Sequence, residues 1–195
     1  MNTVERSGNR RVVTRADDEG FTLLELLVVL LIIGILLAIA IPTFLSTTRN
    51  ADNTAAQANL KTALTGSDAF YMTAGAQSYA GLDFATRGSS TIISLGTGLS
   101  YVSGSAAAAS SQGPGVVSLY VPRGGNALVL TTLARGSMDC WGLVDIKAPV
   151  STPVDHEKKT GTYYFVVKSS SATKCIARKV APTVANISAA AFPHG

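Results

Sequence analysis

Charged residues, cysteine and histidine are scarce in this chain of 195 residues. Charged side chains make up 14% of the sequence, and there are two cysteines and two histidines. The histidines, His156 and His194, have no partners at the spacing that zinc sites use, and the sequence contains no phosphate-binding loop, dinucleotide fingerprint or Gly-x-Ser-x-Gly elbow. Asp139, Asp145 and Asp155 could contribute to a calcium site, but the loop lacks dense oxygen ligands. We therefore expect no enzyme, no catalytic residue, and no cofactor or metal ion.

A strongly basic block is missing as well. The formal net charge is +4, and the first 20 residues, with four arginines and four acidic residues, contribute nothing to it. Beyond them, no run of basic residues is longer than a pair such as Lys158 and Lys159. A thinly spread charge of this kind argues against nucleic acid as a partner.

One long apolar run is present, at Leu26–Ile41, where only Gly34 and two alanines interrupt leucine, valine and isoleucine. Apolar residues cover every face of the implied helix, so the helix must be buried in lipid or in protein. From Leu23 to Leu45, at about 1.5 Å per residue, it is long enough to cross a hydrocarbon core of roughly 30 Å. The sequence therefore predicts a helix that can span a membrane.

Glu25 lies near the start of this segment and does not suit an apolar environment. A carboxylate costs about 2.5 to 3.5 kcal/mol at the centre of a membrane helix on insertion scales, and less near an end. Two interpretations remain open at this point. Either Glu25 lies at the level of the lipid headgroups, where water reaches it, or it pairs with a nearby cation.

Four arginines precede the apolar run and favour a cytoplasmic N-terminus, with the rest of the chain outside. A rival interpretation is a secretory signal peptide, because Ala38-Ile39-Ala40 mimics the small-residue pattern at which such peptides are cleaved. Against it, Glu25 would interrupt the hydrophobic region, the region is long for a signal peptide, and Pro42 would lie two residues past the cut.

The stretch Gly20-Phe21-Thr22-Leu23-Leu24-Glu25, followed by the apolar run and Pro42, resembles the processing site and N-terminal helix of type IV prepilins and pseudopilins. The resemblance implies that a prepilin peptidase cuts between Gly20 and Phe21 and N-methylates Phe21. It also implies that Glu25 faces the terminal amine of a neighbouring subunit during assembly. Such pairing is physically reasonable, because removing one partner of a buried ion pair costs about 3 to 5 kcal/mol. Pro42 should bend the assembly helix without ending it.

Beyond about residue 60 the resemblance concerns architecture alone, and it implies an α+β, pilin-like fold. A long N-terminal helix should pack on an antiparallel β-sheet head of four to five strands. The expected division is a leader peptide at 1–20, a hydrophobic transmembrane and assembly helix at 21–45, and a pilin head domain at 46–195. Within the head we expect an amphipathic helix at 46–73, a variable Gly/Ser-rich connection at 74–115, and the sheet with the C-terminal region at 116–195.

An apolar stripe at helical spacing should seat the head on the helix, and its members are Ala56, Leu60, Ala63, Leu64, Phe70 and Tyr71. Strand-like runs occur at 116–121, 127–133, 140–146 and 162–168, with a fifth candidate at 174–180 and shorter ones at 91–95 and 99–102. The alternation at 163–167 is imperfect and does not decide which face of that strand meets the helix.

The two cysteines, Cys140 and Cys175, both lie in the part that topology places outside the cytoplasm. One disulfide is the simplest interpretation, and by the loop-entropy model it would stabilise a loop of about 35 residues by roughly 3 to 4 kcal/mol. Two free buried thiols or an intermolecular bridge are the alternatives. Trp141, next to Cys140, is expected in the core.

Together these features predict a structural subunit of a type IV pilus, made as a prepilin cleaved after Gly20 and polymerised through its helix into an extracellular filament for adhesion, motility or DNA uptake. The alternatives are a pseudopilin of a type II secretion or competence apparatus, and a membrane-anchored binding domain that never polymerises.

The resemblance also implies partners and locations. The partners are further copies of the chain, other pilins, the prepilin peptidase, an inner-membrane platform protein and an assembly ATPase. Before assembly the subunit should cross the cytoplasmic membrane once with its N-terminus inside, and after assembly it should lie in a cell-surface pilus.

Overall fold

A computed structural model describes residues 20–73, 77–82, 97–105, 110–148, 160–168, 175–180 and 191–193. The chain divides into two compact units, Met1–Thr43 and Phe44–Gly195. The second unit, called the head below, contains every strand among the described residues. Both units contain part of one long helix.

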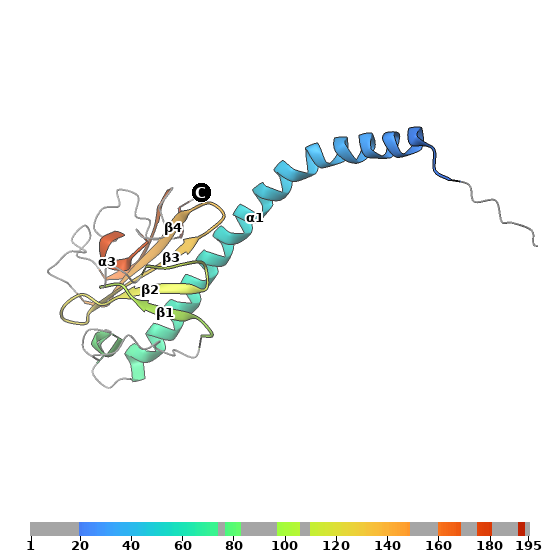
Figure 1. Ribbon diagram of the computed structural model, residues 1–195. Helices are drawn as coiled ribbons and strands as arrows, with labels where there is room; N and C mark the ends of the chain where they lie inside the picture. Colours follow the sequence, from blue (N-terminus) through green and yellow to red (C-terminus); the bar gives the residue numbers. More distant parts are fainter. Residues whose placement is uncertain are drawn as a thin grey trace, which may run out of the picture. The chain divides into compact units, whose positions relative to one another are not determined.

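That helix, α1, extends over Leu23–Thr73 and continues through Pro42 (Figure 1). Proline cannot donate a hydrogen bond to the carbonyl four residues before it. In the residue that follows Pro42, the hydroxyl of Thr43 donates to the carbonyls of Ile39 and Ala40, at 3.2 and 2.9 Å. The helix nevertheless continues past Pro42, so the proline does not end it.

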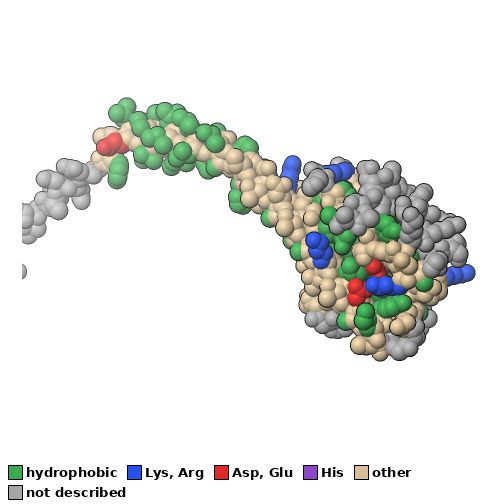
Figure 2. Space-filling model, turned by 180° about the vertical axis from the view of Figure 1, so that it is seen from behind, with side chains coloured by type: hydrophobic (Ala, Val, Ile, Leu, Met, Phe, Trp, Pro, Cys, Tyr) green, Lys and Arg blue, Asp and Glu red, His purple; other side chains and the backbone are tan. Residues whose placement is uncertain are grey.

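The first part of α1 carries large apolar side chains that are exposed on all sides, from Leu23 at 83% to Leu45 at 53% (Figure 2). Among the described residues, α1 is the one helix that is long and apolar enough to cross a membrane. Monomeric soluble proteins rarely expose apolar patches of this extent. This part of the helix therefore requires a cover of lipid or protein.

The head contains a five-stranded sheet in the order β1-β2-β3-β4-β5. Its strands are β1 at Ser100–Ser103, β2 at Val116–Tyr120, β3 at Ala127–Ala134, β4 at Asp139–Ile146 and β5 at Gly161–Val167. Two short helices accompany them, η1 at Ala80–Leu82 and α3 at Ala177–Val180. The predicted α+β class, with a long helix packed on a sheet, is confirmed.

The sheet is mixed, which corrects the expectation of a purely antiparallel one. β1 pairs with β2 in parallel, from Ser100 beside Val116 to Ser103 beside Leu119, whereas all later pairs are antiparallel. A parallel pair needs a long crossover, and the segment 104–115 between these strands supplies it. The expected strand at 91–95 lies outside the described residues, while most of the one at 99–102 is part of β1.

The candidate fifth strand at 174–180 is wrong. Within it, Ala177–Val180 form α3, and the backbone amides there have partners outside any strand ladder. The amide of Ala177 donates to Ser118 Oγ at 3.1 Å, and that of Arg178 donates to the carbonyl of Gly104 at 3.3 Å. These contacts, together with the disulfide at Cys175, override the β-propensity of the segment.

Side chains of the sheet alternate between two cores. One core lies against α1 and includes Leu60 of the helix with Leu130, Trp141 and Val166 of the strands. The core on the opposite face includes Val129, Val144 and Phe165 of the strands with Cys175, Ala177 and Val180. Tyr164 packs with the α1 core and Tyr163 with the other, which settles the orientation of β5.

The predicted apolar stripe on α1 is confirmed as the seat of the head. Ala56, Leu60 and Ala63 are fully buried, and the other three members pack against the same core. Burying one leucine side chain is worth about 1.5 to 3 kcal/mol, so Leu60 alone is a substantial contribution to this contact.

Candidate functional site

The start of α1 is a capping box formed by Thr22 and Glu25. The backbone N–H and the hydroxyl of Thr22 both donate to Glu25 Oε2, at 2.9 and 3.0 Å. In return, the backbone N–H of Glu25 donates to Thr22 Oγ1 at 3.2 Å. This reciprocal pattern satisfies amides that have no partner within the helix, and it places a carboxylate at the positive end of the helix dipole. Glu25 therefore helps to begin the helix.

The sequence interpretation of Glu25 missed this role, although the signal is present. A Ser or Thr followed three residues later by Glu, just before an apolar run, is the pattern of a capping box, and Thr22-Leu23-Leu24-Glu25 matches it. The two interpretations considered above, headgroup exposure and pairing with a cation, now have to accommodate a carboxylate that is already bonded to its own chain.

Only half of the Glu25 carboxylate is used by the cap. Both bonds from Thr22 reach Oε2, and Oε1 has no partner among the described residues. The side chain is exposed and lines an open hollow of about 430 Å³ together with Gly20, Phe21 and Thr22. Because a carboxylate oxygen can accept bonds independently of its twin, Oε1 can bind a further donor without breaking the cap.

The predicted cleavage site lies immediately outside the helix. Gly20 and Phe21 precede Leu23, where α1 begins, and the side chain of Phe21 is 87% exposed. Exposed peptide bonds outside regular structure are the ones that proteases reach most easily. Cleavage after Gly20 and methylation of Phe21 themselves stay predictions, but both residues are accessible.

Pro42, the other residue assigned to assembly, lies far from this end. It is 17 residues after Glu25 on the same helix, which corresponds to about 25 Å at the rise of an α-helix. The structure thus brings Gly20, Phe21 and Glu25 together at one end of α1 and keeps Pro42 apart from them. Within one chain, Pro42 is therefore too far from Glu25 to contact it.

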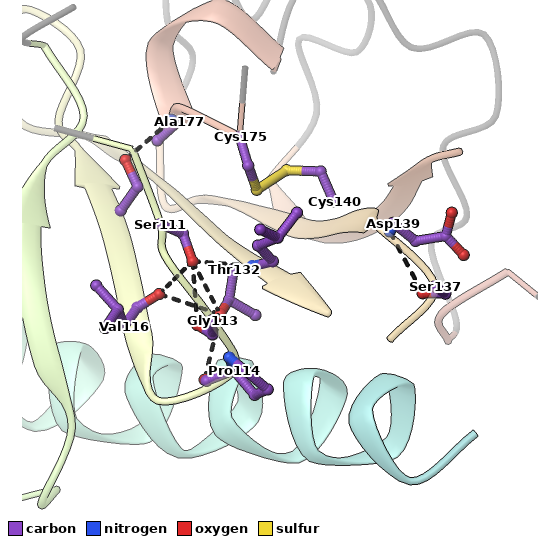
Figure 3. Close-up of a disulfide and its surroundings, with 12 residues drawn as sticks. Ser111, Gly113, Pro114, Val116, Thr132, Ser137, Asp139, Cys140, Cys175 and Ala177 are labelled. Atoms are coloured by element: carbon purple, nitrogen blue, oxygen red, sulfur yellow. Dashed lines mark hydrogen bonds between the residues drawn. A yellow bond between two sulfur atoms is a disulfide. The ribbon is translucent and has the colours of Figure 1, made fainter. Parts of the chain in front are cut away.

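A disulfide joins Cys140, on β4, to Cys175, just before α3, with a Cα–Cα distance of 5.5 Å (Figure 3). Both cysteines are fully buried. Beside the disulfide, the amide of Ser111 donates to the carbonyl of Cys175 at 3.0 Å, and Ser111 Oγ accepts the amide of Leu133 at 2.9 Å. The disulfide therefore anchors Cys175 and the adjoining α3 on the sheet face opposite α1.

A partly buried polar network centred on Tyr79 links the helix to the sheet, and it was not anticipated from the sequence. The Tyr79 hydroxyl lies 2.6 Å from Asp68 Oδ1 and 2.7 Å from Asp145 Oδ2. The Lys147 ammonium lies 2.9 and 3.1 Å from the same two oxygens, and Thr162 donates to Asp145 Oδ1 at 2.7 Å. The five residues come from α1, the segment before η1, β4 and β5, with Lys147 immediately after β4.

The network perturbs two titratable groups. Burial, reinforced by hydrogen bonds to Asp68 and Asp145 and by their charges, raises the pKa of Tyr79 far above its usual value. Burial acts to lower the pKa of Lys147, but hydrogen bonds and charge from the same two carboxylates outweigh it, and the pKa of Lys147 is raised overall. Both groups therefore hold their protons tightly, which suits structural ties and does not suit proton transfer near neutral pH.

Two of the three aspartates considered for calcium are engaged elsewhere. Asp145 belongs to the Tyr79 network, one Asp139 oxygen lies 3.8 Å from Lys168 Nζ, and Asp155 lies outside the described residues. Across the described ranges no three potential metal-ligating side chains form a group.

Comparison with known proteins bears on the N-terminal site alone. Residues 15–41 match a family model described as the prokaryotic N-terminal methylation motif. No curated protein and no solved structure matches the chain. The matched range contains the capping box, both residues of the predicted cleavage site and the apolar run. It supports a precursor of the type IV pilin or pseudopilin kind, and together with the apolar helix it fits membrane anchoring. Residues 15–41 carry the prokaryotic N-terminal methylation motif, which is the type IV prepilin-like signature.

Proposed function

We propose that this chain is the precursor of a type IV pilus subunit, which is cleaved after Gly20 and polymerises through α1. The observation that carries the proposal is the coincidence of three features at one end of one helix. The methylation motif covers residues 15–41, Glu25 keeps one carboxylate oxygen open, and the apolar side chains that follow are exposed on all sides.

Cleavage would create the partner that Glu25 lacks. Hydrolysis between Gly20 and Phe21 releases a new amine at Phe21, and this amine stays positively charged after a single N-methylation. The amine of a neighbouring subunit can then approach Glu25 Oε1 while Thr22 continues to hold Oε2. A pair of this kind, surrounded by the packed apolar helices of a filament, would fix the axial register between subunits, because a mismatched register leaves a buried charge without a partner.

The apolar part of α1 supports both states of such a subunit. Before assembly, lipid covers the exposed side chains between Leu23 and Leu45, and in the filament the helices of other copies cover them. We place the N-terminus in the cytoplasm, because four arginines precede the apolar run, and the mature subunit in a surface pilus. Transfer out of the membrane is costly, so the proposal includes an assembly ATPase and a platform protein, besides the prepilin peptidase and other pilins.

A pseudopilin of a secretion or competence apparatus would use the same N-terminal mechanism. Abundant surface filaments containing this chain support a pilus, and their absence when the assembly proteins are expressed supports the shorter fibre. A membrane-anchored domain that stays monomeric under those conditions would contradict both.

The test separates the charge of Glu25 from its role in the cap. Glu25→Gln keeps an amide oxygen that can accept the Thr22 bonds, since glutamine also serves in capping boxes, but it removes the charge. We expect normal processing and a loss of surface filaments to background, because an unpaired buried amine costs about 3 to 5 kcal/mol, or at least a hundredfold in association. Thr22→Val is the matched control, because it weakens the cap while retaining the charge. Normal filament yield from Glu25→Gln would refute the pairing.

A further inference from the structure

The side chain of Phe192 fills a socket on the sheet face that packs against α1. Its ring centroid lies 5.7 Å from that of Trp141, on β4, and 4.6 Å from that of Tyr164, on β5, both in edge-on geometry. The ammonium of Lys61, on α1, lies 5.9 Å from the same centroid. Edge-on ring pairs and a cation over a ring are both attractive. Lys61, Trp141 and Tyr164, called the aromatic socket below, therefore form a specific site for an aromatic ring.

Side-chain contacts alone hold Phe192 in place among the described residues. Its ring is 9% exposed, and residues 191–193 make no hydrogen bond within the described ranges. By contrast, the disulfide at Cys175 and the hydrogen bonds of the next residues fix the start of the same segment. Val180 belongs to the core opposite α1 and Phe192 to the core against it, with eleven residues between them. Phe192 is thus a plug on a tether that is firmly attached elsewhere.

The ring contacts set how often the aromatic socket opens. Burying one phenylalanine side chain favours the closed form about 10- to 150-fold, and each edge-on ring pair adds about 2- to 10-fold. Ordering the surrounding backbone offsets part of this preference. We therefore expect a closed form favoured about a hundredfold, with the socket open in about 1% of molecules. An open fraction of this size permits exchange with another occupant.

We propose that the aromatic socket is a docking site for the segment around Phe192 of a second copy of this chain, and that the chain's own Phe192 occupies it in the isolated head. The structure points to a second copy, because its segment can reproduce every ring contact at the socket. Exchange of an identical element between copies is a low-cost route to association. The socket and Phe192 both belong to the head, so the inference does not depend on how the head lies relative to the first unit.

A synthetic peptide of residues 181–195 represents the segment of the second copy and tests the proposal. It is added to the full chain in detergent with the substitution Phe192→Ala, which empties the socket. The emission of Trp141, the only tryptophan of the chain, reports binding. A short flexible tether supplies an effective concentration of about 1 mM, so a closed form favoured about a hundredfold corresponds to a Kd of about 10 μM for the peptide.

Three comparisons locate the binding at the aromatic socket. In the wild type the chain's own Phe192 competes, so the apparent affinity for the peptide should be about a hundredfold weaker. Adding Lys61→Met to the Phe192→Ala chain should weaken binding about two- to fivefold, because the cation over the ring is lost. Lys179→Met is the matched control and should change nothing, since this exposed lysine lies on α3, which packs on the opposite face of the sheet.

Urea unfolding verifies that the Phe192→Ala chain is folded. Phe192→Leu keeps an apolar side chain, loses the ring pairs and disturbs the core less, so it should bind the peptide with intermediate affinity. Equal affinity of the peptide for the wild type and the Phe192→Ala chain would overturn the proposal. So would the absence of saturable binding up to about 1 mM, or equal binding of a peptide in which alanine replaces Phe192. None of these results bears on cleavage after Gly20 or on the pairing of Glu25.

Discussion

Replacing Tyr79 with phenylalanine tests the polar network that ties α1 to the sheet. The ring would stay in place beside Tyr71, whose centroid is 4.8 Å away, while the hydroxyl that contacts Asp68 and Asp145 is removed. Asp145 is only 2% exposed and cannot recruit water freely in exchange. It keeps its contacts with Lys147 and Thr162, so the loss is partial. We expect Tyr79→Phe to lower the free energy of unfolding by about 2 kcal/mol at pH 7, the typical value for a hydrogen bond to a charged group.

The same substitution should change how stability depends on pH. The pKa of Tyr79 is raised in the folded state above its ordinary value of 10.0, so its contribution is complete below pH 10 and is lost as the pH rises above it. At pH 11 the unfolded chain gains about 1.4 kcal/mol by ionising a free tyrosine, which the folded chain cannot do. The Tyr79→Phe variant has no tyrosine to ionise at this position, so its unfolded state does not gain this free energy. The difference between the wild type and the variant should therefore shrink from about 2 kcal/mol at pH 7 to about 0.6 kcal/mol at pH 11.

Urea unfolding of the full chain in detergent, followed by the fluorescence of Trp141, measures both quantities. Trp141 is the only tryptophan of the chain and is buried in the head. The matched control is Tyr164→Phe, because the ring of Tyr164 packs against Phe192 and its hydroxyl has no hydrogen-bond partner within the described residues. Equal stability of Tyr79→Phe and the wild type at pH 7, or a difference that does not change up to pH 11, would refute this account of the network.

Two further predictions concern the head. Asn53→Ala removes the oxygen that accepts hydrogen bonds from Ser137 Oγ and Trp141 Nε1, at 2.6 and 3.0 Å. We expect it to lower the free energy of unfolding by about 1 to 3 kcal/mol and to shift the emission of Trp141, because the buried indole N–H loses its partner. Unchanged emission and stability would contradict this. The double variant Cys140→Ala and Cys175→Ala opens a loop with a sequence separation of 35 and should lower the free energy of unfolding by about 4 kcal/mol in the loop-entropy model. A loss below about 1 kcal/mol in urea titration would show that the denatured chain is not constrained by this disulfide.

Much of the fold could be predicted from local pattern. The apolar run predicts the first part of α1, and the spacing of Ala56, Leu60 and Ala63 predicts the face of the helix that the head covers. Runs rich in β-branched and aromatic residues mark β2 to β5, because such residues suit a pleated and largely buried surface. With two cysteines in the chain, the disulfide needed no choice among pairings.

What could not be predicted depends on contacts between distant residues. Nothing in the residues of β1 indicates that it pairs in parallel with β2, because pairing direction is set by the crossover between them. In the network, Tyr79 binds Asp68, 11 positions away in the sequence, and Asp145, 66 positions away. No local sequence pattern predicts contacts over such separations. The segment before Val180 has the composition of a strand, yet the disulfide and the Ser118 contact hold it as a helical turn.

At the N-terminal site the sequence was more informative than our interpretation of it. The identity of Gly20, Phe21 and Glu25 led to the prepilin-like motif, which the comparison at residues 15–41 supports. The capping box at Thr22 and Glu25 could also have been predicted, because the Thr-x-x-Glu spacing before an apolar run is its sequence pattern. The structure joins the two roles, since one carboxylate oxygen serves the cap and the other remains open.

Processing as a prepilin would fix the first residue of the mature chain, so the mature N-terminus is the measurement to make first. Mass spectrometry of the protein recovered from its native host should find a chain that begins at N-methylated Phe21. A chain that begins at Ile41 would instead show cleavage by a signal peptidase, remove Glu25 from the mature protein and contradict the account of assembly.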